Sequence, residues 1–329
     1  MAAIGDTFYA WAADADVLKK GECGGAITAL QQYALKSGMV DAVLAIRKGA
    51  DLYDAVPTLI TDPAEIAQTA GSLHCGTLLL SKVVKDYLDA NKTARLGVTV
   101  KGCDTMGLIE LARRDAVDMD RLLLLGVNCG GSVSPILARK MIREKFEVDP
   151  DQVHKEEIDK GQFIIEYEGG HKGIKIDDLE DEGYGRRSNC RRCLYKVPRQ
   201  ADLACGNWGV IGEKAGNATF VEVCSEKGAN LLDAAVAAGA VKTGAVPAKA
   251  LEIRGKVEGA MLGLGNKWRK KNFEALASDL WGTIARETGR CIKCYSCIEN
   301  CPVCFPVAEE LKGNSRMITS GEVPPNPMF

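Results

Sequence analysis

Four cysteines near the end of the chain stand at a spacing that can hold an iron–sulfur cluster. Residues 291–304 read CIKCYSCIENCPVC, and proline follows the last member of the pattern C-x2-C-x2-C-x3-C, formed by Cys291, Cys294, Cys297 and Cys301. Zinc sites usually join two short ligand pairs from distant parts of a chain. Three consecutive ligands two residues apart instead match the bacterial ferredoxin pattern, so we expect a [4Fe–4S] cluster here.

The fourth ligand of this terminal cluster is open on sequence grounds. In two-cluster ferredoxins the last cysteine of such a run binds the other cluster. We favour Cys301 as the local ligand, and Cys304 is the alternative if Cys301 serves a second cluster.

A second set of cysteines lies in the body of the chain. Cys103 and Cys129 each follow an apolar segment that we expect to be a strand, and ligands of open α/β sheets bind beyond the carboxyl ends of strands. Cys190 and Cys193 form a C-x-x-C pair, which taken alone fits half a zinc ribbon, a redox dithiol or two corners of a cluster. The count fits a second [4Fe–4S] cluster best, held by these four cysteines with Cys205 in reserve.

The elements that position these cysteines follow an α/β pattern. Residues 24–38 predict a helix, with Ile27, Leu30 and Ala34 on one face and Gly38 as the stop signal. Residues 40–46 predict a strand buried on both sides, and residues 94–129 predict a strand, a helix and another strand. We therefore expect an α/β fold with a mainly parallel sheet, plus a β-hairpin insertion over residues 161–176.

The chain is expected to divide into three parts: an FAD-binding α/β part (1–145), a C-x-x-C-containing α/β part (146–265) and a helical ferredoxin-like module (266–329). Ahead of the terminal cysteines, an amphipathic helix is indicated by Phe273, Leu276, Leu280 and Ile284, which recur at helical spacing. This helix is predicted to pack the terminal module onto its neighbour.

Composition narrows the class of protein. The 329 residues include 42 basic and 44 acidic side chains, so there is no basic excess for nucleic acid. The first residues carry acids and no apolar core, which predicts neither a signal peptide nor an anchor, and no stretch predicts a membrane span. Thirteen cysteines favour metal or redox use in a reducing compartment, and we expect a cytoplasmic protein.

Three segments carry a resemblance to a known family. ECGGAITALQQYALKSGMVDAVLAI, TDPAEIAQTAGSLHC and NCRRCLYKVPRQADLACGNWG resemble motifs of the coenzyme F420 hydrogenase/dehydrogenase beta-subunit family, over roughly residues 15–290. The resemblance implies a subunit with FAD and iron–sulfur clusters that exchanges hydride with coenzyme F420. The cofactor-binding residues that it implies are Gly24, Gly25, Thr28, Gly71 and Ser72, and Asn128 is a further candidate for cofactor binding. After Gly-Ser the family often has Lys and an aromatic residue, where this chain has Leu73 and His74.

Electron counting agrees with a flavin. Coenzyme F420 exchanges two electrons as a hydride, whereas a [4Fe–4S] cluster carries one, and a flavin can accept two and release them singly. No carboxylate pair or Ser/His/Asp set stands out, so no catalytic side chain is expected beside the flavin.

The terminal cysteine run together with the resemblance points to a formate dehydrogenase complex, with a catalytic formate-oxidising alpha subunit as partner. The alternatives are the beta subunit of an F420-reducing hydrogenase, an NAD(P)H diaphorase, and a relay subunit docking to a heterodisulfide reductase complex. The absence of G-x-G-x-x-G after a strand argues against a Rossmann NAD site.

Overall fold

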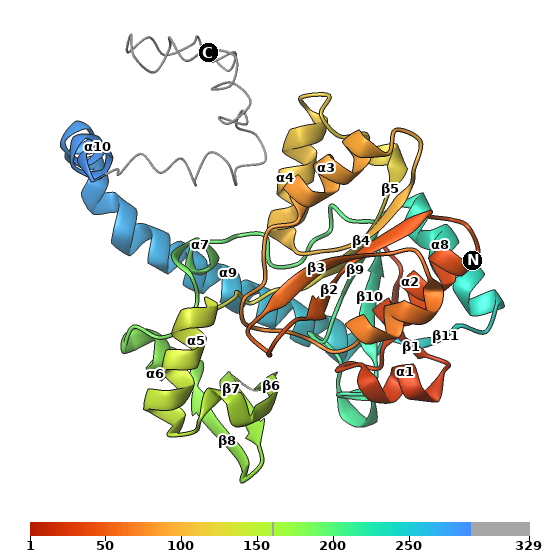
Figure 1. The fold of residues 1–329 in the computed structure, drawn as a ribbon, viewed down its shortest axis with the longest axis horizontal. Helices are drawn as coiled ribbons and strands as arrows, with labels where there is room; N and C mark the ends of the chain where they lie inside the picture. The colour runs from red at the N-terminus through yellow and green to blue at the C-terminus, as the bar shows by residue number, and fades with distance from the viewer. Residues whose placement is uncertain (160, 291–329) are drawn as a thin grey trace.

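The computed structural model describes residues 1–159 and 161–290, which form a large mixed sheet with helices on both faces and a smaller sheet beside it (Figure 1). The large sheet has eight strands in the order β11-β1-β10-β9-β5-β4-β2-β3. Their bounds along the chain are β1 Thr7–Ala12, β2 Ala42–Lys48, β3 Ala55–Ile60, β4 Leu96–Val100, β5 Leu122–Val127, β9 Leu203–Gly206, β10 Thr219–Val223 and β11 Val241–Ala245.

Parallel pairing occupies the centre of this sheet. The pairs β2–β4, β4–β5 and β5–β9 are parallel, while the outer pairs are antiparallel. Because β1 is antiparallel to β10, which is antiparallel to β9, β1 runs in the same direction as β9, β5, β4 and β2. The carboxyl ends of these five strands therefore share one edge of the sheet, where ligands of such folds bind.

The helices of the sheet domain lie in two layers. One layer holds α2 (Ala26–Lys36) and α8 (Glu226–Ala237), with the short α1 (Ala15–Lys20) beside them, and the other holds α3 (Ser81–Ala90) and α4 (Gly102–Ala112) (Figure 1). In β5, Leu123 and Leu125 pack in the core under α2 and α8, whereas Leu122 and Leu124 pack under α3 and α4. Burial on both faces explains the uninterrupted apolar run and confirms the predicted strand.

An insertion between β5 and β9 builds the smaller sheet. It consists of α5 (Pro135–Met141), strands β6 (Val153–Asp159), β7 (Gln162–Tyr167) and β8 (Gly170–Lys175), then α6 (Ile176–Asp181) and α7 (Ser188–Arg191). The predicted hairpin is confirmed as β7 and β8, which pair antiparallel, and β6 adds a third strand. Phe146, Phe163, Ile165 and Leu179 form the core of this insertion.

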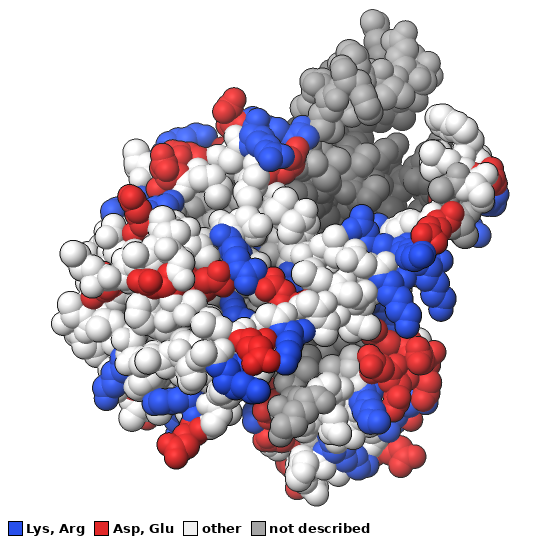
Figure 2. All heavy atoms as spheres, turned by 180° about the vertical axis from the view of Figure 1, so that it is seen from behind, with Lys and Arg blue, Asp and Glu red and all other residues white. Residues whose placement is uncertain are grey.

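The last described helices differ from the prediction. Residues 248–290 form α9 (Ala248–Ala277) and α10 (Leu280–Gly289), separated where Asp279 leaves the helical conformation and caps α10 through the N–H of Gly282. The prediction of a single amphipathic helix with Phe273, Leu280 and Ile284 on one face is therefore wrong. These three side chains are exposed within the described part of the chain. Figure 2 shows basic side chains gathered along the outer part of α9, close to acidic side chains of α6.

Two predictions are not tested by the described residues. The terminal ligands Cys291, Cys294, Cys297 and Cys301 lie outside them, and the division at residues 145 and 265 stays a prediction. Over residues 1–159 and 161–290, no helix combines the length and apolar character needed to cross a bilayer.

Candidate functional site

The four body cysteines lie at the shared carboxyl edge of the sheet. Cys103 is in the first turn of α4, directly after β4, and Cys129 is two residues beyond β5. The backbone N–H of Cys129 donates to the carbonyl of Lys196 at 2.9 Å, which joins this loop to the segment after Cys190 and Cys193. Cys103 is exposed at this edge, and partial desolvation, followed by the charge of Asp104, raises the pKa of its thiol to about 12 against the opposing charge of Lys101.

Two glycines allow the C-x-x-C segment to approach this edge. A Cβ at Gly102 would clash with the carbonyl oxygen of Tyr195, so only glycine lets that segment cross the start of α4. At Gly131, with φ at +139°, a Cβ would lie 2.5 Å from Arg186 Cδ and 3.1 Å from Cys190 Cβ. The sequence thus brings residues far apart in the chain into one group by removing side chains at the crossing points.

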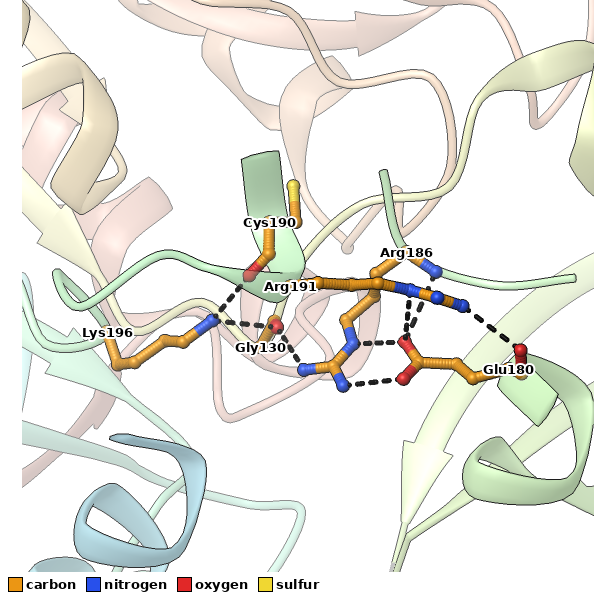
Figure 3. Close-up of polar contacts among 6 residues, drawn as sticks. All are labelled: Gly130, Glu180, Arg186, Cys190, Arg191 and Lys196. Atoms are coloured by element: carbon orange, nitrogen blue, oxygen red, sulfur yellow. Dashed lines mark hydrogen bonds and ion pairs between the residues drawn. The ribbon is translucent and has the colours of Figure 1, made fainter. Parts of the chain in front are cut away.

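A network of cations holds the group together (Figure 3). The Nζ of Lys196 donates to the carbonyls of Gly130 at 3.2 Å and Cys190 at 3.1 Å, and Nη1 of Arg186 donates to the same Gly130 carbonyl at 3.2 Å. Arg186 is paired with Glu180 through a 2.8 Å bond from Nη2, and Arg191 donates to the Glu180 carbonyl. The loop after β5 and the C-x-x-C turn are therefore fixed to each other by charged donors.

Lys196 differs from Arg186 in lacking an acid. Its side chain is among the largest that are fully buried, yet within the described residues no carboxylate oxygen lies within 4.0 Å of its Nζ. Burial lowers the pKa of Lys196, while the thiols of Cys193, Cys129 and Cys190 act in the opposite direction. A buried ammonium is costly without a compensating anion, so this site favours an anionic occupant.

These residues fit an iron–sulfur cluster. Four thiols from three segments supply the ligand number that a [4Fe–4S] cluster requires, and a cluster with four thiolates supplies the negative charge that Lys196 lacks. Among residues 1–159 and 161–290, no three His, Cys, Asp or Glu side chains converge as ligands of a single metal ion. A cluster places each thiolate on a separate iron, so its four ligands need not converge on one metal ion.

Cys205 is separated from this group. It is fully buried in β9 and packs in the core with Leu125 and Val221, where Arg254 and Cys224 are its charged or polar neighbours. The structure therefore does not bring this reserve ligand to the other four cysteines.

The glycines before α2 lie at the same edge, but packing within the chain accounts for them. Gly24 and Gly25 have φ of +77° and +66°, and the Gly24 carbonyl accepts from the N–H of Ala12 at the end of β1. A Cβ at Gly24 would clash with the carbonyl of Asn217, and one at Gly25 would lie 2.5 Å from the carbonyl oxygen of Val17. Thr28 is buried in α2, so flavin contacts by these residues stay a prediction.

The structure brings two motifs of the resemblance together through a pair that sequence reasoning missed. Glu22, just before Gly24, lies 3.4 Å from Nε2 of His74, which follows the turn at Gly71 and Ser72. Burial alone would raise the pKa of Glu22, but His74, together with a hydrogen bond from Ser72, holds it below its ordinary value. The departure at His74 was the only sequence signal for this pair.

Asn128 offers a free acceptor at the sheet edge. Its Nδ2 donates to Oδ1 of Asn207 at 3.3 Å, while its own Oδ1 is buried and has no hydrogen-bond partner among the described residues. An N–H group of a bound cofactor would satisfy that oxygen, because buried acceptors are rarely left unpaired. This observation is the clearest fit of the edge to a flavin, whose ring carries such a group.

The fold and site define an α/β protein with four cysteines at the carboxyl edge of its sheet. Residues 7–85 and 93–249 match the N-terminal and C-terminal parts of the family described as coenzyme F420 hydrogenase/dehydrogenase, beta subunit. The chain belongs to this family, which confirms the resemblance.

Curated relatives cover nearly the whole chain. It is 48% identical to the F420-dependent formate dehydrogenase 1 subunit beta of Methanococcus maripaludis, over 98% of this chain and 82% of that protein. It is 46% identical to the F420-dependent formate dehydrogenase subunit beta of Methanocaldococcus jannaschii, over 97% of this chain and 82% of that protein.

A solved structure shares the fold. A chain in a structure of the F420-reducing [NiFe] hydrogenase complex from Methanosarcina barkeri superposes with a TM-score of 0.70, at 22% identity, over 80% of this chain and 91% of that chain. This likeness supports the mixed α/β architecture.

Proposed function

We propose that this chain is the beta subunit of an F420-dependent formate dehydrogenase, an oxidoreductase subunit that passes electrons between a formate-oxidising subunit and coenzyme F420. The observation that carries the proposal is the 48% identity to such a subunit along 98% of the chain. Lys196, buried beside Cys129, Cys190 and Cys193 with no carboxylate within 4.0 Å in the described part of the chain, supports a redox centre independently of that identity.

The proposal assigns roles to the chain's own residues. Cys103, Cys129, Cys190 and Cys193 hold one [4Fe–4S] cluster at the sheet edge, and the terminal run Cys291, Cys294, Cys297 and Cys301 holds a second. Asn128 and the backbone around Gly24 position FAD near the same edge. When bound, FAD would exchange a hydride with coenzyme F420 and single electrons with the clusters.

Helix α9 links the two cluster positions along the chain. A Cβ at Gly265 would lie 3.1 Å from the carbonyl oxygen of Cys193, so α9 passes directly over the C-x-x-C turn. From there α9 and α10 lead to Arg290, next to the first cysteine of the terminal run. This arrangement suits a terminal cluster that meets the redox chain of a catalytic alpha subunit in the cytoplasm, or that of a heterodisulfide reductase complex.

Cofactor content tests the proposal directly. Anaerobically purified chain should contain about eight irons and one FAD, since two sets of four cysteines each hold four irons. Cys190→Ser should retain about four irons. With a dye as acceptor, the wild-type chain should oxidise reduced coenzyme F420 faster than it oxidises NADH. A colourless protein holding only zinc, or a preference for NADH, would refute this function.

A further inference from the structure

Lys196 is the buried charge that the proposed function leaves without a role. It stands three residues after Cys193, and both of its hydrogen bonds go to backbone carbonyls, those of Gly130 and Cys190. Each of these carbonyls belongs to a cysteine or to the residue beside one, since Gly130 follows Cys129. The ammonium is thus attached to both loops that carry candidate ligands.

In the same network, the neighbouring cation Arg186 is paired with a carboxylate. Arg186 donates to the same carbonyl of Gly130 at the same distance, but Glu180 accepts from its guanidinium and neutralises its charge (Figure 3). Arg191 also lies beside Glu180, at 3.9 Å. The acid therefore pairs with the two arginines, whereas the side chains that interact favourably with the Lys196 charge are the thiols of Cys193, Cys129 and Cys190.

We propose that Lys196 is the counter-ion of the cluster on Cys103, Cys129, Cys190 and Cys193 and sets its reduction potential. The inference rests on the proposed function, since it needs that cluster to be present. Reduction adds one electron, delivered by the partner's redox chain or by the flavin, and no proton, so the ligated centre becomes more negative by one charge. A fixed ammonium stabilises the reduced form more than the oxidised form and therefore raises the potential.

The size of the effect follows from Coulomb's law. One unit charge about 10 Å away, at an effective dielectric constant of about 20, changes the reduction equilibrium on the order of tenfold. The substitution Lys196→Gln separates the charge of Lys196 from its hydrogen bonds, because glutamine can still donate to the carbonyls of Gly130 and Cys190 but carries no charge.

The experiment is a redox titration followed by electron paramagnetic resonance on the anaerobically purified full chain. The signal that disappears in Cys190→Ser identifies the cluster concerned. Lys196→Gln should shift the midpoint of that signal to lower potential, by an amount equivalent to a decrease of about tenfold in the reduction equilibrium constant. Lys196→Arg should keep the wild-type midpoint. Iron content and FAD content are measured on every variant.

A matched control tests whether disturbing the network alone moves the potential. The double variant Glu180→Gln with Arg186→Gln removes a cation and its acid together, so the net charge is unchanged while the second donor to Gly130 is altered. Its midpoint should equal that of the wild type. A shift in this variant as large as that in Lys196→Gln would overturn the charge assignment.

The remaining outcomes also decide. If Lys196→Gln keeps both its iron and the wild-type midpoint, Lys196 does not set the potential. Loss of about four irons in Lys196→Gln but not in Lys196→Arg supports the counter-ion role, whereas loss in both shows a purely steric role and overturns it. If Cys190→Ser loses no iron, the cluster assignment of the proposed function fails, and this inference falls with it.

Discussion

At the scale of one residue, Gly25 shows that a glycine in a family motif can be required for folding. It begins α2 with φ at +66°, and a Cβ there would lie 2.5 Å from the carbonyl oxygen of Val17. Gly25→Ala should therefore lower the free energy of unfolding by more than the conformational cost of about 1 kcal/mol. Gly38→Ala is the matched control, because Gly38 has φ at +72° but open space around its Cβ position. Equal losses in urea unfolding of the two variants would contradict the close packing at Gly25.

Glu156 gives a second prediction at this scale. It is buried in β6, and this burial outweighs favourable contacts with the side chains and backbone of His74 and Cys75. Burial raises its pKa above the usual 4.5, so its ionisation destabilises the folded state increasingly as the pH rises above that value. Glu156→Gln should be more stable than wild type at pH 8, by roughly 1–3 kcal/mol, with a smaller gain at pH 5.

The control for Glu156 is an exposed acid of the same insertion. Glu168 lies in the turn between β7 and β8, and Glu168→Gln should leave the free energy of unfolding within about 0.5 kcal/mol of wild type at both pH values. If the gain in the free energy of unfolding of Glu156→Gln did not increase between pH 5 and pH 8, the pKa of Glu156 would not be raised in the folded state.

At the scale of elements, a buried arginine contributes to fixing α9 to the sheet. The guanidinium of Arg254 lies 4.3 Å from the centroid of the Phe220 ring in β10, and its Nη1 donates to the carbonyl of Trp208 at 3.1 Å. Arg254→Ala removes this packing and leaves that carbonyl unpaired, so it should cost about 2–4 kcal/mol. Lys256→Ala, on an exposed turn of the same helix, should cost under about 0.5 kcal/mol in the same denaturation assay. Similar losses would mean that α9 is held elsewhere.

The elements also show what sequence could predict. Strands β2, β4 and β5 were predicted because buried strands read as apolar runs, helix α2 because it carries an apolar face, and helix α4 because its segment lies between two strand patterns. The break between α9 and α10 was missed because helical periodicity in Phe273, Leu280 and Ile284 continues across Asp279. Periodicity reports spacing, whereas a helix end depends on a capping bond such as that from Asp279 to Gly282.

The candidate site was predictable in its cysteines but not in its charges. Cys103 and Cys129 follow strand patterns, and parallel strands bring their carboxyl ends to one edge, so topology alone places them together. Lys196, Arg186 and Glu180 carry no spacing signal, since their roles arise from contacts between a loop after β5 and an insertion more than fifty residues later.

At the scale of the whole molecule, the terminal cysteine run is predicted to connect the chain to its catalytic partner. Under the proposed function, the four cysteines of the body hold a cluster at the sheet edge, so electron exchange with the flavin needs no second cluster. Ending the chain after Arg290 keeps α9, which backs the C-x-x-C turn at Gly265, together with α10. That variant should contain about four irons, oxidise reduced coenzyme F420 with a dye at close to the wild-type rate, and lose formate-dependent reduction of the coenzyme in the reassembled complex. Cys294→Ala in the full chain serves as the matched variant, because it removes a ligand and keeps the segment. If either variant couples formate to the coenzyme at the full rate, the terminal run supports structure rather than electron transfer, since an electron route through its cluster could not survive the loss of that cluster.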